Sequence, residues 1–394
     1  MDGDTVARET AVELLARLPT PEAAVERVGL DHAAGRTLLR PVEAPADVPA
    51  VDRATMDGYA VAAGDDYPLT VVDEVYPEDD PPELDEGEGV AVATGAPLPA
   101  RADAVVMRER ATVSGGELTG PTLEPGTNVY PEGATATADE VLFAAGDRLA
   151  PRHATLLRDV GVGQVTVRAP LDVGLVPTGS EIHEGRQPDR DSEMLANLLR
   201  GWSHDPTLGA SLPDDAGTVR EGIEGAVERH DAVVTTGGTS VGSADHVVSV
   251  LRDHELLFNG VALRPGRPMT VATVEGTPVF ALPGKPIAAH AAATLVARAY
   301  FAGSVDLPTV PAAMAVDLAV PDQAVEFAIP VTLEDGDATP LGHAESSFPL
   351  YGERFAPGRV ASSTRVSLAD GFVLTRAGLD AGEEVGVVPY EVVE

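Results

Sequence analysis

The sequence predicts an α/β plus β fold divided among several domains, and three observations lead to this prediction. The 394 residues exceed the size of one hydrophobic core and would form two to four domains, for which a hydrophobic content of 44% is ample. Strand-like apolar runs alternate with helical patterns between residues 170 and 306, which is typical of a three-layer domain around a mostly parallel sheet. Short β runs separated by turns fill residues 41–127 and the chain after Pro308.

The N-terminal half contains three segments that differ in their predicted secondary structure. Residues 1–40 predict two helices, one to about Leu18 and one from Asp31 to about Leu39. Residues 41–127 predict a small β-rich domain. Residues 128–169 predict short strands and one helix, Arg152–Asp159, closed by Gly161. We expect this segment to pack on the N-terminal helices, so that residues 1–40 and 128–169 form one discontinuous linker domain.

The C-terminal half predicts an α/β domain, residues 170–306, and a small barrel or sandwich, residues 307–394. In the α/β domain the expected strands are Asp172–Val176 and Ala232–Thr235, with a hairpin of Val271–Val274 and Thr277–Leu282. Its expected helices are Ser192–Arg200, a segment opened by a capping box at Thr218 and ending near Arg229, His246–His254, and Pro286 to about Phe301. The last domain has expected strands at Ala313–Ala319, Glu326–Leu333, Gly371–Leu374 and Glu384–Pro389.

Composition narrows the possible functions. The chain has 27 Lys and Arg against 63 Asp and Glu, a net charge of −36, which suits the cytoplasm of a salt-accumulating cell. An acidic face for a basic partner is the alternative, but the acid is spread along the whole chain. Nucleic acid is disfavoured without a basic patch. The absence of cysteine excludes thiolate catalysis, Cys-bound zinc and disulfides. We expect no membrane contact, because neither a signal peptide nor an apolar run of about 18 residues occurs.

Three glycine-centred loops carry the strongest functional signal. They cover Thr235–Asp245, Leu263–Pro268 and Leu282–Pro286, and each comes after an apolar run. Such loops present bare backbone N–H groups at the carboxyl edge of an α/β sheet, where phosphates and pterin-like rings can dock. Arg264, Arg267 and the only lysine, Lys285, add positive charge. The loops therefore predict a polyanionic small-molecule ligand.

Other motifs have both a structural and a functional explanation. Asp52 and Asp57 flank a turn that could be an ordinary Asp-Gly β-turn, and Thr94–Pro99 could be a stiffened connection. Thr178–Glu181 places hydroxyls and a carboxylate at a strand end, where such folds bind ligands. Asp214 and Asp215 precede a helix, and helix-start charge is a sufficient explanation for both. Asp245 closes the first glycine loop, and a carboxylate beside phosphate-binding amides suits Mg²⁺. The nine histidines show no metal-ligand spacing.

Taken in order, six motifs resemble the MoeA family, the molybdopterin molybdenumtransferases. They are DRATMDGYA, TGAPLPARADAVVM, PTGSE, TTGGTSVGSAD, LRPGRP and LPGKP, and together they span nearly the whole chain. The C-terminal part of gephyrin is similar. The TTGGTSVGSAD segment is shared with the molybdopterin adenylyltransferases, a possible partner, whereas MDGYA, TGAPLP and the extra β domains favour the MoeA side.

The resemblance implies an elongated four-domain subunit and a homodimer, in which the linker domain would serve dimerisation. The α/β domain would hold adenylated molybdopterin, and the partner's small β domain would complete the cleft. Members of the family insert molybdate with Mg²⁺ and release AMP. The implied active-site residues are Asp52, Thr94, Glu181, Asp214 and Asp245, with Asp214 and Asp245 as metal ligands. The implied cofactor-binding residues are Gly179, Ser180, Gly237, Gly238, Ser240, Gly242, Arg264, Gly266, Arg267, Pro283, Gly284, Lys285 and Pro286, of which the two prolines would shape the loop.

The chain departs from the family pattern where the anion would be handled. An arginine-rich stretch followed by Gly-Glu-Asp is replaced by Tyr130–Thr135, and an asparagine by Glu193. Lys285, Ile329 and Arg359 also stand where the family has other residues, and we expect Lys285 and Arg359 to replace lost cations. Alternatives therefore stay open. They are a paralogue that handles tungstate or acts as a carrier, an oligomeric scaffold, and an unrelated nucleotide-binding enzyme.

Overall fold

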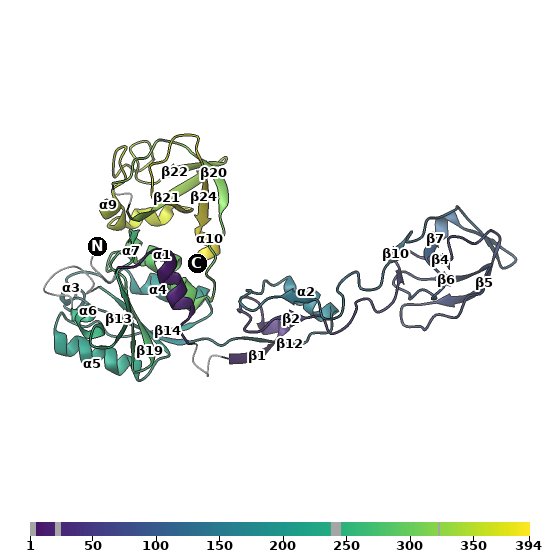
Figure 1. The fold of residues 1–394 in the computed structure, drawn as a ribbon, viewed down its shortest axis with the longest axis horizontal. Coiled ribbons are helices and arrows are strands. Elements are labelled where there is room, and N and C mark those ends of the chain that lie inside the picture. Colours follow the sequence, from purple (N-terminus) through teal and green to yellow (C-terminus); the bar gives the residue numbers. More distant parts are fainter. Residues whose placement is uncertain (1–4, 20–24, 238–245, 322–323) are drawn as a thin grey trace. The chain divides into compact units, whose positions relative to one another are not determined.

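The structure, a computed structural model, describes residues 5–19, 25–237, 246–321 and 324–394. The chain forms two compact units, which Figure 1 shows in ribbon form. None of the helices in these ranges has the length and apolar character that crossing a membrane requires. The first unit contains Met1–Glu26, Gly35–Thr37 and Arg168–Glu394, and the second contains Arg27–Ala34 and Leu38–Val167.

A six-stranded sheet in the order β14-β13-β15-β19-β18-β16 forms the centre of the first unit. The first four strands run parallel, and β18 and β16 are antiparallel to their neighbours. Strands β13, β15 and β19 are buried along most of their length, which their uninterrupted apolar runs predict for central parallel strands. The strands are β13 (Asp172–Pro177), β14 (Asp205–Leu208), β15 (Ala232–Thr236), β16 (Glu255–Asn259), β18 (Thr270–Val274) and β19 (Thr277–Leu282).

Helices cover both faces of this sheet, as Figure 1 shows. On one face, Leu195 and Leu199 of α4 pack in a core with α1, α7 and α8; on the other, Val219 and Ile223 pack with α6. The predicted three-layer α/β architecture is thus confirmed. The helices are α1 (Arg8–Ala16), α3 (Ser180–His183), α4 (Ser192–Gly201), α5 (Ala216–Val227), α6 (His246–Leu251), α7 (Pro286–Ala292) and α8 (Arg298–Phe301), with a π-helical turn, Ala293–Ala297, joining the last two.

The start of α5 differs from the prediction. The capping residue is Asp215, whose Oδ1 accepts hydrogen bonds from the Thr218 backbone N–H and from its hydroxyl, both at 2.8 Å. The capping box expected at Thr218 is therefore wrong by three residues. These bonds stabilise the ionised carboxylate and lower the pKa of Asp215.

A closed barrel follows the α/β domain in the same unit. Strands β21, β22, β20, β24 and β23 pair in that order, and β23 pairs back with β21, so a barrel rather than a sandwich forms. The strand expected at Ala313–Ala319 instead ends at Met314, because Leu318 and Ala319 make only isolated bridges. The elements are β17 (Leu263–Arg264), β20 (Val310–Met314), β21 (Glu326–Glu334), β22 (Asp337–Pro340), β23 (Gly371–Thr375), β24 (Glu384–Pro389), α9 (Pro357–Ala361) and α10 (Tyr390–Val393).

The N-terminal segment folds differently from its prediction. Helix α1 packs in the core of the first unit through Ala11 and Leu15, whereas the sequence predicts that residues 1–40 pack with residues 128–169. The second helix, expected from Asp31 to about Leu39, is wrong: only a 3₁₀ turn, Leu30–His32, forms. The Leu38 and Leu39 amides instead donate to Asp147 and Thr166, so extended pairing replaces the helix.

The second unit is β-rich, as expected. Its main sheet has the order β7-β4-β6-β5-β9-β8, and a separate apolar cluster joins Leu30 and Leu38 to Leu157 of α2 and Val165 of β12. The bounds are β1 (Val25–Gly29), β2 (Val42–Glu43), β3 (Arg53–Ala54), β4 (Gly58–Val61), β5 (Leu69–Val75), β6 (Glu88–Val92), β7 (Ala104–Met107), β8 (Thr112–Ser114), β9 (Glu117–Thr119), β10 (Val129–Tyr130), β11 (Val141–Phe143), β12 (Gln164–Arg168) and α2 (His153–Asp159).

The buried ring of His204 makes the first unit sensitive to acid. Its Nδ1 accepts from the Leu171 amide at 3.0 Å, and its Nε2 donates to the Phe301 carbonyl at 2.7 Å, so the neutral ring is fully bonded. Burial lowers the pKa of His204 to about 4. Stability is therefore lost as pH falls below the unfolded-state pKa of about 6.5 and continues to fall until about pH 4.

We expect His204→Gln to remove this dependence. The difference in unfolding free energy between the wild type and this variant should shrink by about 2 kcal/mol between pH 7 and pH 5. Denaturant titrations of both proteins at the two pH values measure it. A constant difference would mean that the ring is protonated without cost.

Candidate functional site

Three strand ends place the predicted loops side by side. In the parallel sheet Pro177 pairs with Thr236, and Thr236 pairs with Leu282, so β13, β15 and β19 end at one edge. The loops that begin at Thr178, Gly237 and Pro283 therefore leave the sheet as neighbours. This is the carboxyl edge at which doubly wound folds bind ligands.

Two glycines let these loops touch through their backbones. A Cβ on Gly284 would lie 2.9 Å from the Gly237 Cα, and one on Gly237 would lie 2.5 Å from the Thr178 carbonyl oxygen. Gly237 also has a φ of +84°, a conformation that favours glycine. A side chain at either position would push the loops apart.

The loops enclose a pocket of 550 Å³, within the size range of small-molecule sites. Nine of the residues along its wall belong to the predicted glycine loops, and Glu181 of α3 also reaches it. Residues of α9 in the barrel line it too; the expected contribution of this segment is Arg359, but the residues at the wall are Pro357, Gly358 and Ala361. The lining comprises Glu181, Gly237, Arg264, Pro265, Gly266, Arg267, Pro268, Pro283, Gly284, Lys285, Ala288, Pro357, Gly358 and Ala361.

The pocket carries uncompensated positive charge. Within the described parts of the chain, Arg264, Arg267 and Lys285 form no ion pair with a carboxylate. Of the described residues on the wall, only Glu181 is acidic. In a chain of net charge −36, three cations in one pocket favour an anionic ligand.

Ser180 and Asp214 are tied to each other. The Ser180 amide donates to Asp214 Oδ2 at 3.0 Å, and the Asp214 amide donates to Ser180 Oγ at 2.9 Å. This reciprocal pair joins the loop after β13 to the segment before α5. These two hydrogen bonds position Asp214, and they occupy the backbone amide and one lone pair of the hydroxyl oxygen of Ser180. Neither residue lines the pocket, nor do Gly179 and Pro286.

The rest of the first glycine loop falls in the undescribed range. Gly238, Ser240, Gly242 and Asp245, all predicted to bind cofactor or metal, lie outside the described residues. Among those that are described, no three His, Cys, Asp or Glu side chains converge to hold a metal ion.

The second unit holds Asp52 and Thr94 in different surroundings from those expected. Asp52 Oδ1 accepts from the Glu132 amide at 2.8 Å and lines a cleft of 720 Å³ with Arg101. The partner of Thr94 is Asp57, whose Oδ1 accepts from both the Thr94 amide, at 2.7 Å, and its hydroxyl, at 2.8 Å. These bonds lower the pKa of Asp57. The resemblance implies Asp52 as the active-site residue of DRATMDGYA, whereas the aspartate bonded to Thr94 is Asp57.

The altered family positions fall into two groups. Lys285 lines the pocket, so it supplies a cation there. Ile329 is fully buried in the barrel core, and Arg359 donates to the Leu350 carbonyl at 2.9 Å and lies outside the pocket lining. The expectation that Arg359 brings a cation to the pocket therefore has no geometric support. Tyr130 and Thr135 bond to each other through their hydroxyls at 2.9 Å.

A carboxylate at the start of α4 is buried in surroundings that disfavour its ionised form. Asp191 is 6% exposed, and its Oδ1 has no hydrogen-bond partner among the described residues. Burial, reinforced by the charge of Asp189, raises the pKa of Asp191 to about 6. Between about pH 3.8 and pH 6 the carboxyl is ionised in the unfolded chain but still protonated in the folded protein. The folded state therefore loses stability as the pH rises through this range.

Asp191→Asn should relieve this cost without changing the side-chain shape. We expect the variant to be more stable than the wild type by up to about 3 kcal/mol at pH 7, with the gain vanishing below about pH 4. Thermal or denaturant unfolding at both pH values measures it. A destabilised variant at pH 7 would show that the ionised carboxylate is instead held by a favourable contact.

Two family models match most of the chain. An N-terminal region of MoeA proteins, covering their domains I and II, matches residues 6–161, and a probable molybdopterin binding domain matches residues 174–302. Together with the loop-lined pocket in the second match, they define the class: a multi-domain protein with a molybdopterin-binding α/β domain.

Similar proteins include named molybdopterin molybdenumtransferases and a solved MoeA structure. A molybdopterin molybdenumtransferase of Synechococcus elongatus is 33% identical over 308 residues, covering 70% of this chain and 75% of that protein. One of Haemophilus influenzae is 30% identical over 291 residues, covering 70% and 72%. A crystal structure of the MoeA protein of Pyrococcus horikoshii is 30% identical with a TM-score of 0.74, covering 98% of this chain and 99% of that one. The chain belongs to the MoeA family of molybdopterin molybdenumtransferases, transferases of molybdenum cofactor biosynthesis.

Proposed function

We propose that the 550 Å³ pocket binds adenylated molybdopterin and that the protein inserts molybdate into it with Mg²⁺, releasing AMP. The observation that carries this proposal is the convergence of Gly237, Arg267 and Lys285 on one pocket at the carboxyl edge of the sheet. Phosphates and molybdate are all oxyanions, and a pocket with bare glycine backbone and three cations that form no ion pair with any described carboxylate suits such groups.

The cations take the binding role. Arg264, Arg267 and Lys285 neutralise the phosphate and molybdate oxygens, and each charge-assisted hydrogen bond contributes roughly 1.5–3 kcal/mol. Gly237 and Gly284 keep the loops close enough for backbone N–H groups to reach the ligand. Pro283 and Pro286 fix the shape of the loop that presents Lys285.

The carboxylates take the reaction role. Glu181, at the pocket wall, places the water or oxygen that displaces the adenylate. Asp214, positioned by Ser180, and Asp245 hold Mg²⁺, which lowers the charge on the phosphate oxygens when bound. A carboxylate such as that of Asp214 suits this ion, since Mg²⁺ is commonly held by one or two carboxylates plus phosphates and waters.

The second unit serves a neighbouring subunit in this proposal. In a homodimer, Asp52, Asp57 and Thr94 of one subunit complete the cleft of the other. The hydrogen bonds from Thr94 keep the Asp57 carboxylate ionised and fixed in direction, which suits a group that orients a ligand or an ion. The acidic, lysine-poor composition supports a cytoplasmic protein in a salt-accumulating cell. In this proposal a molybdopterin adenylyltransferase supplies the ligand.

Purified protein mixed with adenylated molybdopterin, Mg²⁺ and molybdate in molar KCl should release AMP. The variants Asp57→Asn and Asp245→Asn should each release AMP more slowly while remaining folded. AMP is quantified by chromatography, and folding is followed by circular dichroism. Tight ligand binding without AMP would favour the carrier alternative. A faster reaction with tungstate would change the assigned oxyanion, and absence of any binding would leave the scaffold role.

A further inference from the structure

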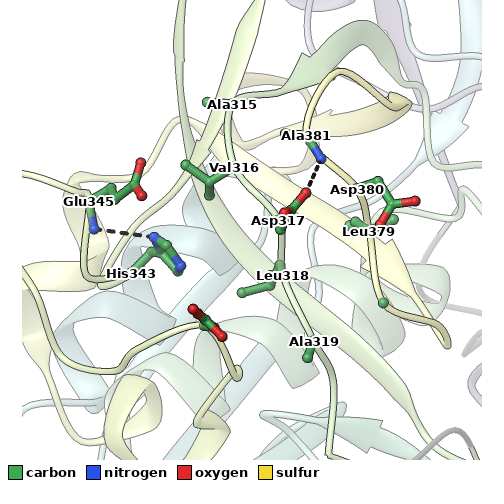
Figure 2. A pocket seen from close by; sticks show the side chains of 12 residues that line it. Ala315, Val316, Asp317, Leu318, Ala319, His343, Glu345, Leu379, Asp380 and Ala381 are labelled. Carbon is green, nitrogen blue, oxygen red and sulfur yellow. Dashed lines mark hydrogen bonds between the residues drawn. The ribbon is translucent and has the colours of Figure 1, made fainter.

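The barrel contains a second cleft, and none of the described residues that line it also lines the pocket of the proposed function. It has a volume of 620 Å³ and lies beside the segment Ala315–Ala319, which follows β20. Figure 2 shows how the side chains are arranged around it. Val316 and Leu318 provide apolar surface, while acidic side chains come from several segments of the barrel.

Among the described residues, four carboxylates line this cleft, those of Asp317, Glu345, Glu353 and Asp380, and no Lys or Arg does. Among the described residues, none of the four forms an ion pair. The Asp317 Oδ1 accepts from the Ala381 amide at 2.7 Å, which fixes its direction (Figure 2). The carboxylates do not converge as a metal site, because no group of three suitable ligands occurs among the described residues. A ligand that meets several of them must therefore be larger than a single ion.

His343 supplies a second, independent feature. Its side chain lines the cleft, although the residue is only 3% exposed. Its Nδ1 accepts from the Glu345 amide at 3.2 Å, so the proton of the neutral ring is on Nε2. Nε2 is buried and has no hydrogen-bond partner in the described structure. In Figure 2 this second nitrogen faces away from Glu345, toward the space beside Leu318. A buried donor without a partner, at the wall of a cleft, calls for an acceptor from a ligand.

The three features together describe one kind of molecule. Spread carboxylates require positive charge, the orphaned N–H of His343 requires an oxygen acceptor, and the walls from Val316 and Leu318 favour a carbon skeleton. We propose that this cleft is a binding site for a small organic cation that carries hydroxyl oxygens, of the amino alcohol or amino sugar class. The proposal is independent of the reaction assigned to the other pocket.

Three probes of matched shape test the site on the full chain by isothermal titration calorimetry. Glucosamine carries both the charge and the hydroxyls. N-acetylglucosamine keeps the ring and hydroxyls but lacks the charge, and cyclohexylamine keeps the charge but lacks the oxygens. We expect glucosamine to bind more tightly than either of the other two. Equal binding of N-acetylglucosamine, or no heat of binding with glucosamine, would overturn the proposal. Equal binding of cyclohexylamine would also overturn it, because the acceptor for His343 would then be unnecessary.

Two variants locate the binding. Glu353→Gln combined with Asp380→Asn should weaken glucosamine binding about five-fold or more, since each exposed ion pair is worth a modest amount. His343→Phe should weaken it about three-fold or more by removing the donor. Glu334→Gln, an exposed acid on the same barrel outside the cleft, should leave binding unchanged. Unaltered affinity in the folded double variant would place the ligand elsewhere. If His343→Phe does not fold, the comparison of glucosamine with cyclohexylamine still decides the role of the donor.

Discussion

Replacing Gly237 with alanine should lower the rate of AMP release by about 100-fold or more, because small displacements of a site's loops have effects of this size. The new Cβ would lie 2.5 Å from the Thr178 carbonyl oxygen, a backbone atom that cannot turn aside. The loop after β15 would have to move away from Thr178, which would disturb its close backbone contact with Gly284. AMP release under saturating ligand measures the effect.

Gly276→Ala is the matched control. Gly276 has a φ of +89°, close to the +84° of Gly237, but a Cβ there would meet nothing within 4 Å. It should lose about 1–2 kcal/mol of stability from the left-handed backbone and keep its activity. Gly237→Ala should lose more stability, because the collision adds to the same backbone cost. Equal activity in the two variants would show that contact between the loops is not needed for the reaction.

Removing two cations from the pocket should have the second large effect. Arg267→Met combined with Lys285→Met keeps much of the side-chain length but deletes two charge-assisted contacts. We expect the affinity for adenylated molybdopterin to fall about 100-fold or more, since each contact contributes roughly 1.5–3 kcal/mol. Equilibrium dialysis or calorimetry in molar KCl measures it. The loss should be smaller for ligand without the adenylate, which carries fewer oxyanions.

Arg200→Met serves as the control for net charge. Arg200 is an exposed cation on α4 that bonds to Asn197 and lies outside the pocket lining. Its removal should leave the affinity unchanged. If the double variant and Arg200→Met bind the ligand equally well, the pocket is not the anion site, and the proposed function loses its main support.

The sequence located the candidate site through its glycine loops. Gly237 and Gly284 follow apolar strands, and the register of a parallel sheet brings the ends of such strands together, so their meeting at the pocket could be anticipated. The loop of Gly266 instead follows β17, which pairs with β21 of the barrel, so the parallel sheet does not explain its place in the pocket. The Asp57–Thr94 pair could not be anticipated in the same way. Thirty-six other residues separate the two, and only the folded β-rich unit shows which aspartate meets the hydroxyl. The contribution of α9 was anticipated only through Arg359, whereas the residues that line the pocket are Pro357, Gly358 and Ala361.

By itself, the sequence determined the alternation of strands and helices, the hairpin of β18 and β19, the long alanine-rich helix and the family. Each of these depends on local patterns, because periodicity and turn chemistry act over a few residues. The tertiary structure decided that Leu38 and Leu39 pair with distant segments instead of forming a helix and that Asp215 caps α5. It also decided that β23 closes the barrel onto β21. The physical reason is shared: competing local conformations differ by little free energy, and hydrogen bonds and packing with residues far along the chain choose between them.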